Sequence, residues 1–138
     1  KHIDKKFAHK YYRDLTVGLD FTARDIQNEL RGKGFPWEKS KGFDNSALIG
    51  EWLNKDDFSD INNIDFHLTK NDKICQNSNS SKMIWKIDEI ISYVSKFFTL
   101  KIGDLIFTGT PSGVSKLVEN DILEGFIQNK KCFNIKIK

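Results

Sequence analysis

One apolar stripe constrains the fold of this chain more than any other feature. Between residues 87 and 98, large apolar side chains recur at the spacing of one helix face, at Ile87, Ile90, Ile91, Val94, Phe97 and Phe98. This pattern predicts an amphipathic helix with one apolar side. Because the flanking segments have the patterns of strands, we expect this helix to pack on a sheet.

Strands are predicted on both sides of that helix. Upstream, apolar and polar residues alternate over 64–68, a turn falls at Asn71-Asp72, and a return strand begins at Ile74. Downstream we expect a strand at 105–107, a loop at 108–113, and a hairpin of 122–128 and 133–137 around Asn129-Lys130.

The first third of the chain contains a strand followed by a second helix. Residues 15–19 (LTVGL) have the pattern of a buried strand, and residues 7–12 could be a short helix or a turn. A helix is predicted over 22–31, with Thr22 as its N-cap, and residues 34–45 are expected to form a long loop. Together these elements predict a sheet-rich α+β fold.

Composition narrows the class of protein. The 138 residues, 38% hydrophobic, fit one domain spanning 1–138 with a buried core, and no apolar run approaches the ~18 residues of a membrane span. Acidic and basic residues alternate and the net charge is only +3, so we expect neither a nucleic-acid partner nor a membrane. Two cysteines cannot form a disulfide framework, which favours the reducing cytoplasm.

Common catalytic and phosphate-binding motifs are absent, including GxSxG, GxxxxGK[ST], GxGxxG, HExxH and CxxC. The three histidines, His2, His9 and His67, lack the spacing of metal ligands and are expected to be surface or structural residues. Cys75 and Cys132 are predicted to be free thiols.

The segment 20–27 (DFTARDIQ) is the first candidate site. Asp20 directly follows a predicted strand, where a hard cation or a substrate often binds, while Arg24, Gln27 and Arg31 share one helix face. A carboxylate beside a guanidinium and an amide suits a metal ion with an anionic substrate. Alternatively, the acid complements the helix dipole and the polar residues form a solvated face.

The segment 105–114 (LIFTGTPSGV) is the second candidate. Its glycines, proline and threonines predict a rigid loop with exposed amides and hydroxyls, which could hold a carboxylate or phosphate, or could be a tight structural turn. Lys41, in the aromatic loop FPWEKSKGF, is a third candidate, for which surface charge is the simpler interpretation.

Together these segments resemble the fumarylacetoacetate hydrolase superfamily, and more narrowly its acylpyruvate hydrolase branch. The stretch LTVGLDFTARDIQNELRGKGFPWEKSKGFDNSALIG is similar to the core block of the family, and SKMIWKIDEIISYVSKFFTLKIGDLIFTGTPSGV to its second signature. The resemblance covers residues 5–138 and implies a mixed β-roll with flanking helices that forms a homodimer.

The resemblance assigns roles to five residues. It implies that Asp20 ligates a divalent cation, Mg²⁺ or Mn²⁺, and that Arg24, Gln27 and Lys41 are catalytic residues that face the substrate. Thr110, the second threonine of TGTP, is implied to bind a substrate carboxylate. If these roles are right, the five residues converge on one cleft.

The sequence departs from the family pattern in its metal ligands and its base. A Glu-x-Glu pair that completes the metal site, and a lid with a His and a Glu that act as base, are both missing from residues 1–138. The chain begins at Lys1 without a Met, so we expect an N-terminally truncated catalytic domain that is inactive by itself. Ser115 and Asp72 stand where the family usually has glycine.

The implied reaction is metal-dependent hydrolysis of a C–C bond in an acylpyruvate, a 2,4-diketo acid. Lys41, Arg24 and Gln27 are expected to offset developing negative charge, and Thr110 to orient the carboxylate. The same metal site could instead decarboxylate oxaloacetate or isomerise an enol diacid. Two non-enzymatic alternatives are an inactive fragment and a binding protein with the same fold.

Overall fold

The computed structural model describes residues 1–138 as an α+β fold, which confirms the predicted fold class. Its elements, in chain order, are η1 (Lys5–Lys10), β1 (Asp14–Leu15), β2 (Gly18–Asp20), α1 (Arg24–Gly32), α2 (Glu38–Lys41), β3 (Ala47–Ile49), β4 (Leu53–Asn54), η2 (Lys55–Asp57), β5 (Asp65–Lys70), β6 (Lys73–Asn79), η3 (Ser80–Lys82), α3 (Ile87–Phe97), β7 (Ile122–Ile127) and β8 (Lys130–Lys136), where η denotes a 3-10 helix.

The largest sheet is antiparallel, with strand order β6-β5-β7-β8. Asn71 and Asp72 both have positive φ, 51° and 64°, as a two-residue hairpin turn requires, so the turn predicted between β5 and β6 is confirmed. The turn between β7 and β8 lies at Gln128 and Asn129, one residue earlier than predicted, because Lys130 already pairs with Ile127.

Two shorter antiparallel ladders precede this sheet. The strand predicted over residues 15–19 is split: Leu15 in β1 pairs with Leu53 in β4, whereas Gly18 in β2 pairs with Ile49 in β3. Residues 15–19 are half-buried rather than buried. Thr16 lies between the two ladders, where its hydroxyl donates to the Glu51 carbonyl at 2.8 Å.

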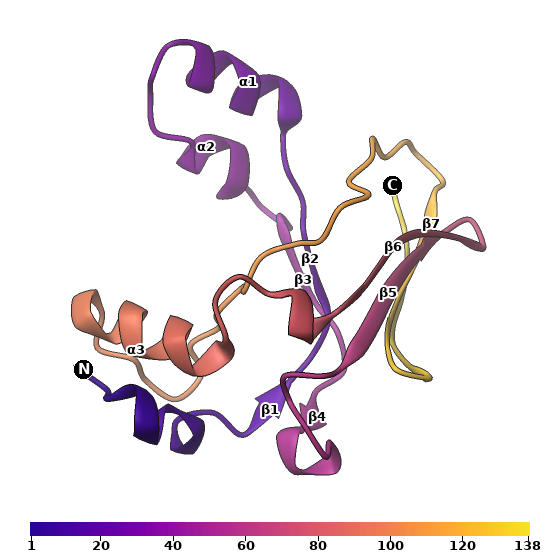
Figure 1. The fold of residues 1–138 in the computed structure, drawn as a ribbon. Helices are drawn as coiled ribbons and strands as arrows, with labels where there is room; N and C mark the ends of the chain where they lie inside the picture. Colours follow the sequence, from indigo (N-terminus) through magenta and orange to yellow (C-terminus); the bar gives the residue numbers. More distant parts are fainter.

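Helices α1 and α2 form an arm that projects from the β2–β3 ladder, away from the four-stranded sheet (Figure 1). Helix α1 begins at Arg24 with Ala23 as its N-cap, so the prediction of Thr22 as N-cap was wrong. Residues 34–45 are not a continuous loop, since they contain α2, where the Ser40 hydroxyl donates to the Trp37 carbonyl at 2.7 Å.

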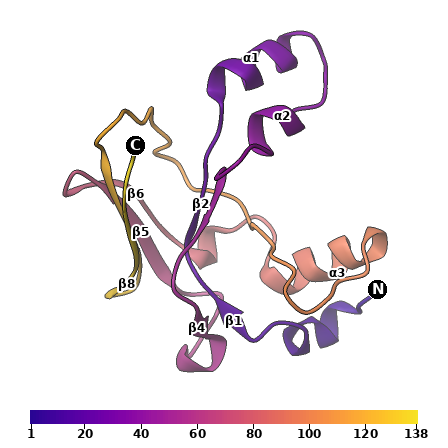
Figure 2. The same cartoon turned by 180° about the vertical axis from the view of Figure 1, so that it is seen from behind.

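The predicted helix over residues 87–98 is confirmed as α3, but it packs on η1 rather than on the large sheet. Ile91 lies in a buried cluster with Ile3 and Ala8, and the two helices run side by side in both views (Figures 1 and 2). Phe97 and Phe98, at the end of the stripe, are exposed. The stripe is therefore only partly buried.

The segment between α3 and β7 is irregular over residues 98–121, and the strand predicted at 105–107 is not formed. This part of the chain passes beside β2 before it reaches the large sheet (Figure 2), and the Phe107 ring lies against Gly18. The β2–β3 ladder has no third strand, so this segment passes β2 without pairing with it.

A second apolar core lies between the short ladders and the large sheet. It contains the buried residues Leu53, Ile64, Ile127 and Cys132. The two cysteines are free thiols, as predicted. None of the helices has the length and apolar character needed to cross a membrane.

Candidate active site

The end of β2 brings Asp20 together with Lys41. The Lys41 Nζ donates to Asp20 Oδ2 at 2.6 Å and to the Thr22 hydroxyl at 2.8 Å. Both charged side chains are partly exposed, Asp20 by 47% and Lys41 by 37%. Strand β2 and helix α2 thus place a carboxylate, an ammonium and a hydroxyl in one accessible cluster.

The first turn of α1 brings Arg24 together with Gln27. The Arg24 Nη1 donates to Gln27 Oε1 at 2.5 Å, across the i, i+3 spacing of a helix. Gln27 is buried while Arg24 is exposed, so the amide fixes one terminal nitrogen of the guanidinium and leaves its other N–H groups accessible.

Ser40 fixes α2 against the start of α1. Its side chain is fully buried, and its backbone carbonyl accepts from the Ala23 N–H at 3.0 Å. The Phe21 N–H donates to the Ser46 carbonyl at 2.8 Å, which extends the β2–β3 ladder toward the arm. These bonds hold Lys41 close to Asp20, although the two are 21 positions apart.

Thr110 is held by a different part of the fold. Its hydroxyl accepts from Gln76 Nε2 on β6 at 3.0 Å, and no hydrogen bond joins Thr110 to Asp20, Arg24 or Lys41. The Phe107 ring nevertheless lies against Gly18, two residues before Asp20. Convergence of all five residues on one cleft therefore stays a prediction.

The unused hydrogen-bonding groups of these residues are mostly donors. The Lys41 ammonium has used two of its three N–H bonds, and Gln27 has used its carbonyl but not its amide N–H groups. The Arg24 guanidinium can only donate, and the Thr110 hydroxyl still has its own hydrogen to donate. Such a set suits an anionic ligand, with Asp20 as the one anionic acceptor.

The residues of this chain do not by themselves fit a divalent cation. No group of three or more His, Cys, Asp or Glu side chains comes together within residues 1–138, and the Asp20 carboxylate is paired with Lys41. Hard divalent ions take about six or more oxygen ligands, several of them carboxylates in tight protein sites. One carboxylate leaves such a site incomplete.

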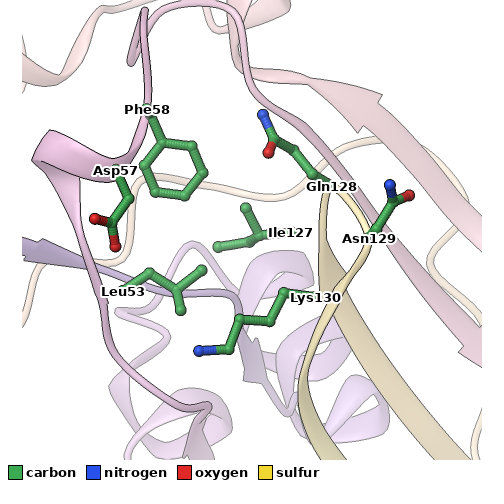
Figure 3. A pocket seen from close by; sticks show the side chains of 7 residues that line it. All are labelled: Leu53, Asp57, Phe58, Ile127, Gln128, Asn129 and Lys130. Atoms are coloured by element: carbon green, nitrogen blue, oxygen red, sulfur yellow. The ribbon is translucent and has the colours of Figure 1, made fainter.

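A hollow of about 510 Å³ lies elsewhere, between β4–η2 and the turn of the β7–β8 hairpin (Figure 3). Leu53, Phe58 and Ile127 form its apolar floor, with Asp57 and Lys130 at its sides. The Lys130 Nζ is paired with Glu51 at 2.7 Å, outside the set of residues that line the hollow. None of the five predicted site residues lines this hollow.

Two residues that contact the candidate site residues, Thr22 and Gln76, were not predicted from the sequence to belong to the site. Thr22 was predicted to cap a helix, but it accepts from Lys41 and donates to the Asp20 carbonyl. Gln76 lies in the polar run QNSNSS, and its contact with Thr110 joins positions 34 apart. The TARD motif could have pointed to Thr22, whereas the sequence has no signal for Gln76.

The chain matches one family over almost its whole length. Residues 1–135 match the family described as fumarylacetoacetate (FAA) hydrolase C-terminal. The predicted site segments 20–27 and 105–114, together with Lys41, all lie within the match.

Curated relatives include enzymes that act on oxaloacetate. The chain is 39% identical over 136 residues to the mitochondrial oxaloacetate tautomerase FAHD1 of Mus musculus, covering 99% of this chain and 62% of the relative. It is 37% identical over 124 residues to the mitochondrial oxaloacetate decarboxylase of Dictyostelium discoideum, covering 90% and 57%. The chain thus spans about three fifths of the length of these relatives.

A solved structure shows the same fold with ligands bound. The fumarylpyruvate hydrolase of Pseudomonas aeruginosa, in complex with Mn²⁺ and pyruvate, superposes with a TM-score of 0.92 at 34% identity. The match covers 99% of this chain and 58% of the other.

Proposed function

This chain belongs to the fumarylacetoacetate hydrolase C-terminal family, and from that premise we propose that its protein hydrolyses a C–C bond of an acylpyruvate. The observation that carries the proposal is the set of free donors on Lys41, Arg24, Gln27 and Thr110. A 2,4-diketo acid carries a permanent carboxylate and develops a second negative charge during cleavage, and donors stabilise both.

The bond changes define where each donor acts. Water adds to the acyl carbonyl carbon, the bond between that carbon and the CH₂ group breaks, and its electron pair forms the enolate of pyruvate. Protonation of that enolate carbon gives pyruvate, while the acyl group leaves as a carboxylate. Lys41 and Arg24 face the oxygen that becomes negative, and Gln27 donates beside them.

Thr110 binds the carboxylate that does not react. Its hydroxyl retains a hydrogen to donate, and the irregular segment that carries it crosses beside β2. Holding the carboxylate sets the distance between the acyl carbon and the cations of the arm. In this role Thr110 contributes to substrate orientation.

Asp20 is proposed as one ligand of Mg²⁺ or Mn²⁺, with other ligands from water or from groups outside residues 1–138. The Mn²⁺ in the Pseudomonas aeruginosa fumarylpyruvate hydrolase supports this proposal. Mn²⁺ binding followed by electron paramagnetic resonance should be weakened by Asp20→Asn but not by Asp25→Asn, an exposed acid in the first turn of α1. Equal effects of the two changes contradict the assignment.

A second candidate is tautomerisation or decarboxylation of oxaloacetate, favoured by the similarity to the mouse oxaloacetate tautomerase and the Dictyostelium discoideum oxaloacetate decarboxylase. Oxaloacetate has a 2-oxo carboxylate like that of an acylpyruvate, and its decarboxylation also forms the enolate of pyruvate. Acylpyruvate hydrolysis and oxaloacetate decarboxylation therefore need the same donors. The relatives are mitochondrial, and a cytoplasmic location of this protein stays a prediction from composition.

We also propose that the protein forms a homodimer. The chain exposes 9797 Å², whereas a compact monomer of 16.0 kDa exposes about 7,400 Å². Exposed aromatic residues on α3 contribute, with Tyr93 in edge contact with Trp85 and Phe97. Sedimentation equilibrium should give twice the chain mass at micromolar concentration, and a monomer contradicts this proposal.

The activity test uses the product of the complete reading frame. Turnover of acetylpyruvate and of oxaloacetate is measured with Mg²⁺, with Mn²⁺ and with EDTA. We expect EDTA-sensitive turnover, faster with acetylpyruvate if hydrolysis is the main reaction and faster with oxaloacetate if the second candidate is right. Absence of turnover of either keto acid overturns both candidates.

A further inference from the structure

Gln76 on β6 makes two hydrogen bonds to the loop that carries Thr110. Its Nε2 donates to the Thr110 hydroxyl and to the Pro111 carbonyl, each at 3.0 Å. Gln76 is half-buried, and the bonds join residues 34 and 35 positions apart. The loop is therefore attached to the large sheet at the residue implied to bind the substrate carboxylate.

The chemistry of Pro111 settles which end of the Gln76 amide faces the loop. A carbonyl oxygen can only accept, so the group that faces it is the NH₂ and not the amide oxygen. The same NH₂ then donates to the Thr110 oxygen. The Gln76 N–H therefore occupies one lone pair of the Thr110 oxygen. Because of this, the hydrogen of the Thr110 hydroxyl must point away from Gln76, to another acceptor.

Gly113 keeps the loop at this distance from β6. A Cβ at Gly113 would lie 2.0 Å from the Cys75 carbonyl oxygen and 3.1 Å from Gln76 Cγ, and Gly113 has a φ of 102°. Only a glycine allows this approach and this backbone conformation. The contact between the loop and the strand thus begins at Gln76 and continues through Cys75.

We propose that Gln76 is a positioning residue that holds the Thr110 hydroxyl as a hydrogen-bond donor toward the carboxylate of a 2-oxo acid. The identity of that ligand rests on the proposed function. In a purely structural role, Gln76 would attach the loop to the sheet without affecting a ligand. In the positioning role, its effect on ligand binding passes through the Thr110 hydroxyl.

The test is a double-mutant cycle read by pyruvate binding. Calorimetry measures the Kd of pyruvate for the product of the complete reading frame, loaded with Mn²⁺, and for Gln76→Met, Thr110→Val and the double variant. Gln76→Met should raise Kd about 3–10-fold, the worth of one neutral hydrogen bond, and should add nothing when Thr110→Val is already present. The matched control Asn77→Leu, at an exposed neighbour on β6, should leave Kd unchanged.

Gln76→Glu gives a second readout, which serves if Gln76→Met fails to fold. A carboxylate at this position accepts from Thr110 and turns its hydrogen away from the ligand, but a protonated carboxyl can donate as the amide does. The ratio of variant to wild-type Kd should therefore fall as the pH is lowered from 7.5 to 5. The same ratio for Asn77→Asp should stay constant.

The outcomes separate this proposal from the proposed function. If the wild type binds pyruvate but turns over no keto acid, the proposed function fails, and the cycle still decides the role of Gln76. Losses that add in the double variant, a Gln76→Met protein that binds pyruvate like the wild type, or a wild type that binds no pyruvate each overturn the proposal.

Discussion

The four-stranded sheet and the α1–α2 arm bury different kinds of side chain. In the sheet, Leu123, Ile127 and Phe133 are all at least nine-tenths buried. In the arm the buried residues are Gln27 and Ser40, both polar, while large apolar side chains stay exposed. The sheet is stabilised by apolar burial and the arm by hydrogen bonds and ion pairs. Changes in the arm should therefore affect chemistry more than stability.

The largest stability effect is expected at Leu123, which is 1% exposed near the start of the inner strand β7. Leu123→Ala should lower the free energy of unfolding by about 3–5 kcal/mol, because it removes apolar contacts and leaves a cavity. Ile26→Ala, at a 38% exposed position on α1, should cost less than about 1 kcal/mol. Urea unfolding measures both, and equal losses contradict the contrast.

The α3–η1 cluster should lie between these extremes. Ile91 is 5% exposed and contacts the apolar residues of η1 and its flanks. Ile91→Ala should cost about 2–4 kcal/mol through cavity formation. A loss below about 1 kcal/mol in the same urea experiment shows that α3 is peripheral to the fold.

Two glycines of the TGTPSG loop test the contact between this loop and strand β6 of the large sheet. Gly109 and Gly113 both have positive φ, but a Cβ at Gly109 meets nothing within 4 Å, whereas at Gly113 it meets the Cys75 carbonyl. Gly109→Ala should cost about 1–2 kcal/mol from backbone strain, and Gly113→Ala more, because it also separates the loop from β6. Thermal unfolding ranks the two, and the reverse order contradicts the loop contact.

Protonation of Asp121, next to the start of β7, should destabilise the fold more than protonation of Glu29 on the arm. The pKa of Asp121 lies below its ordinary value, because the Val118 backbone N–H and the Asn71 amide donate to it. The pKa of Glu29 is lowered by its hydrogen bond with Lys33, but that pair is exposed on α1. A carboxyl with a lowered folded-state pKa stabilises the fold above its unfolded pKa, and this contribution is lost as the pH falls through the folded pKa.

Stability should therefore be flat between about pH 5 and pH 7 and fall below about pH 4. Asp121→Asn should remove part of that acid dependence, and Glu29→Gln very little, since exposed pairs contribute little. Urea midpoints between pH 3 and pH 7 measure the effect. An unchanged acid limb in Asp121→Asn contradicts the assignment.

The same two regions differ in how much of them could be predicted from the sequence. The Asn71-Asp72 turn and the alternation before it are local signals, and the β5–β6 hairpin follows them. The split between β1 and β2 and the missing strand at 105–107 depend on which partner each segment finds. Such partners lie far along the chain, so local patterns do not contain them.

The candidate site shows the same limit. The motif resemblance selected Asp20 and Lys41, and the structure joins them at 2.6 Å, yet the pattern alone gave Lys41 no role beyond surface charge. The contacts of Thr22 and Gln76 come from side-chain geometry between distant segments. Residue types could be predicted from the sequence, but their hydrogen-bonding directions could not.

One comparison of two lysines tests the central claim most directly. Lys41 donates to Asp20 and Thr22, whereas Lys39, two residues earlier in α2, is exposed and makes no ion pair. In the product of the complete reading frame, Lys41→Met should lower kcat/KM for the preferred keto acid about 10²–10³-fold, and Lys39→Met should leave it unchanged. Lys41→Met activity equal to that of Lys39→Met contradicts the account.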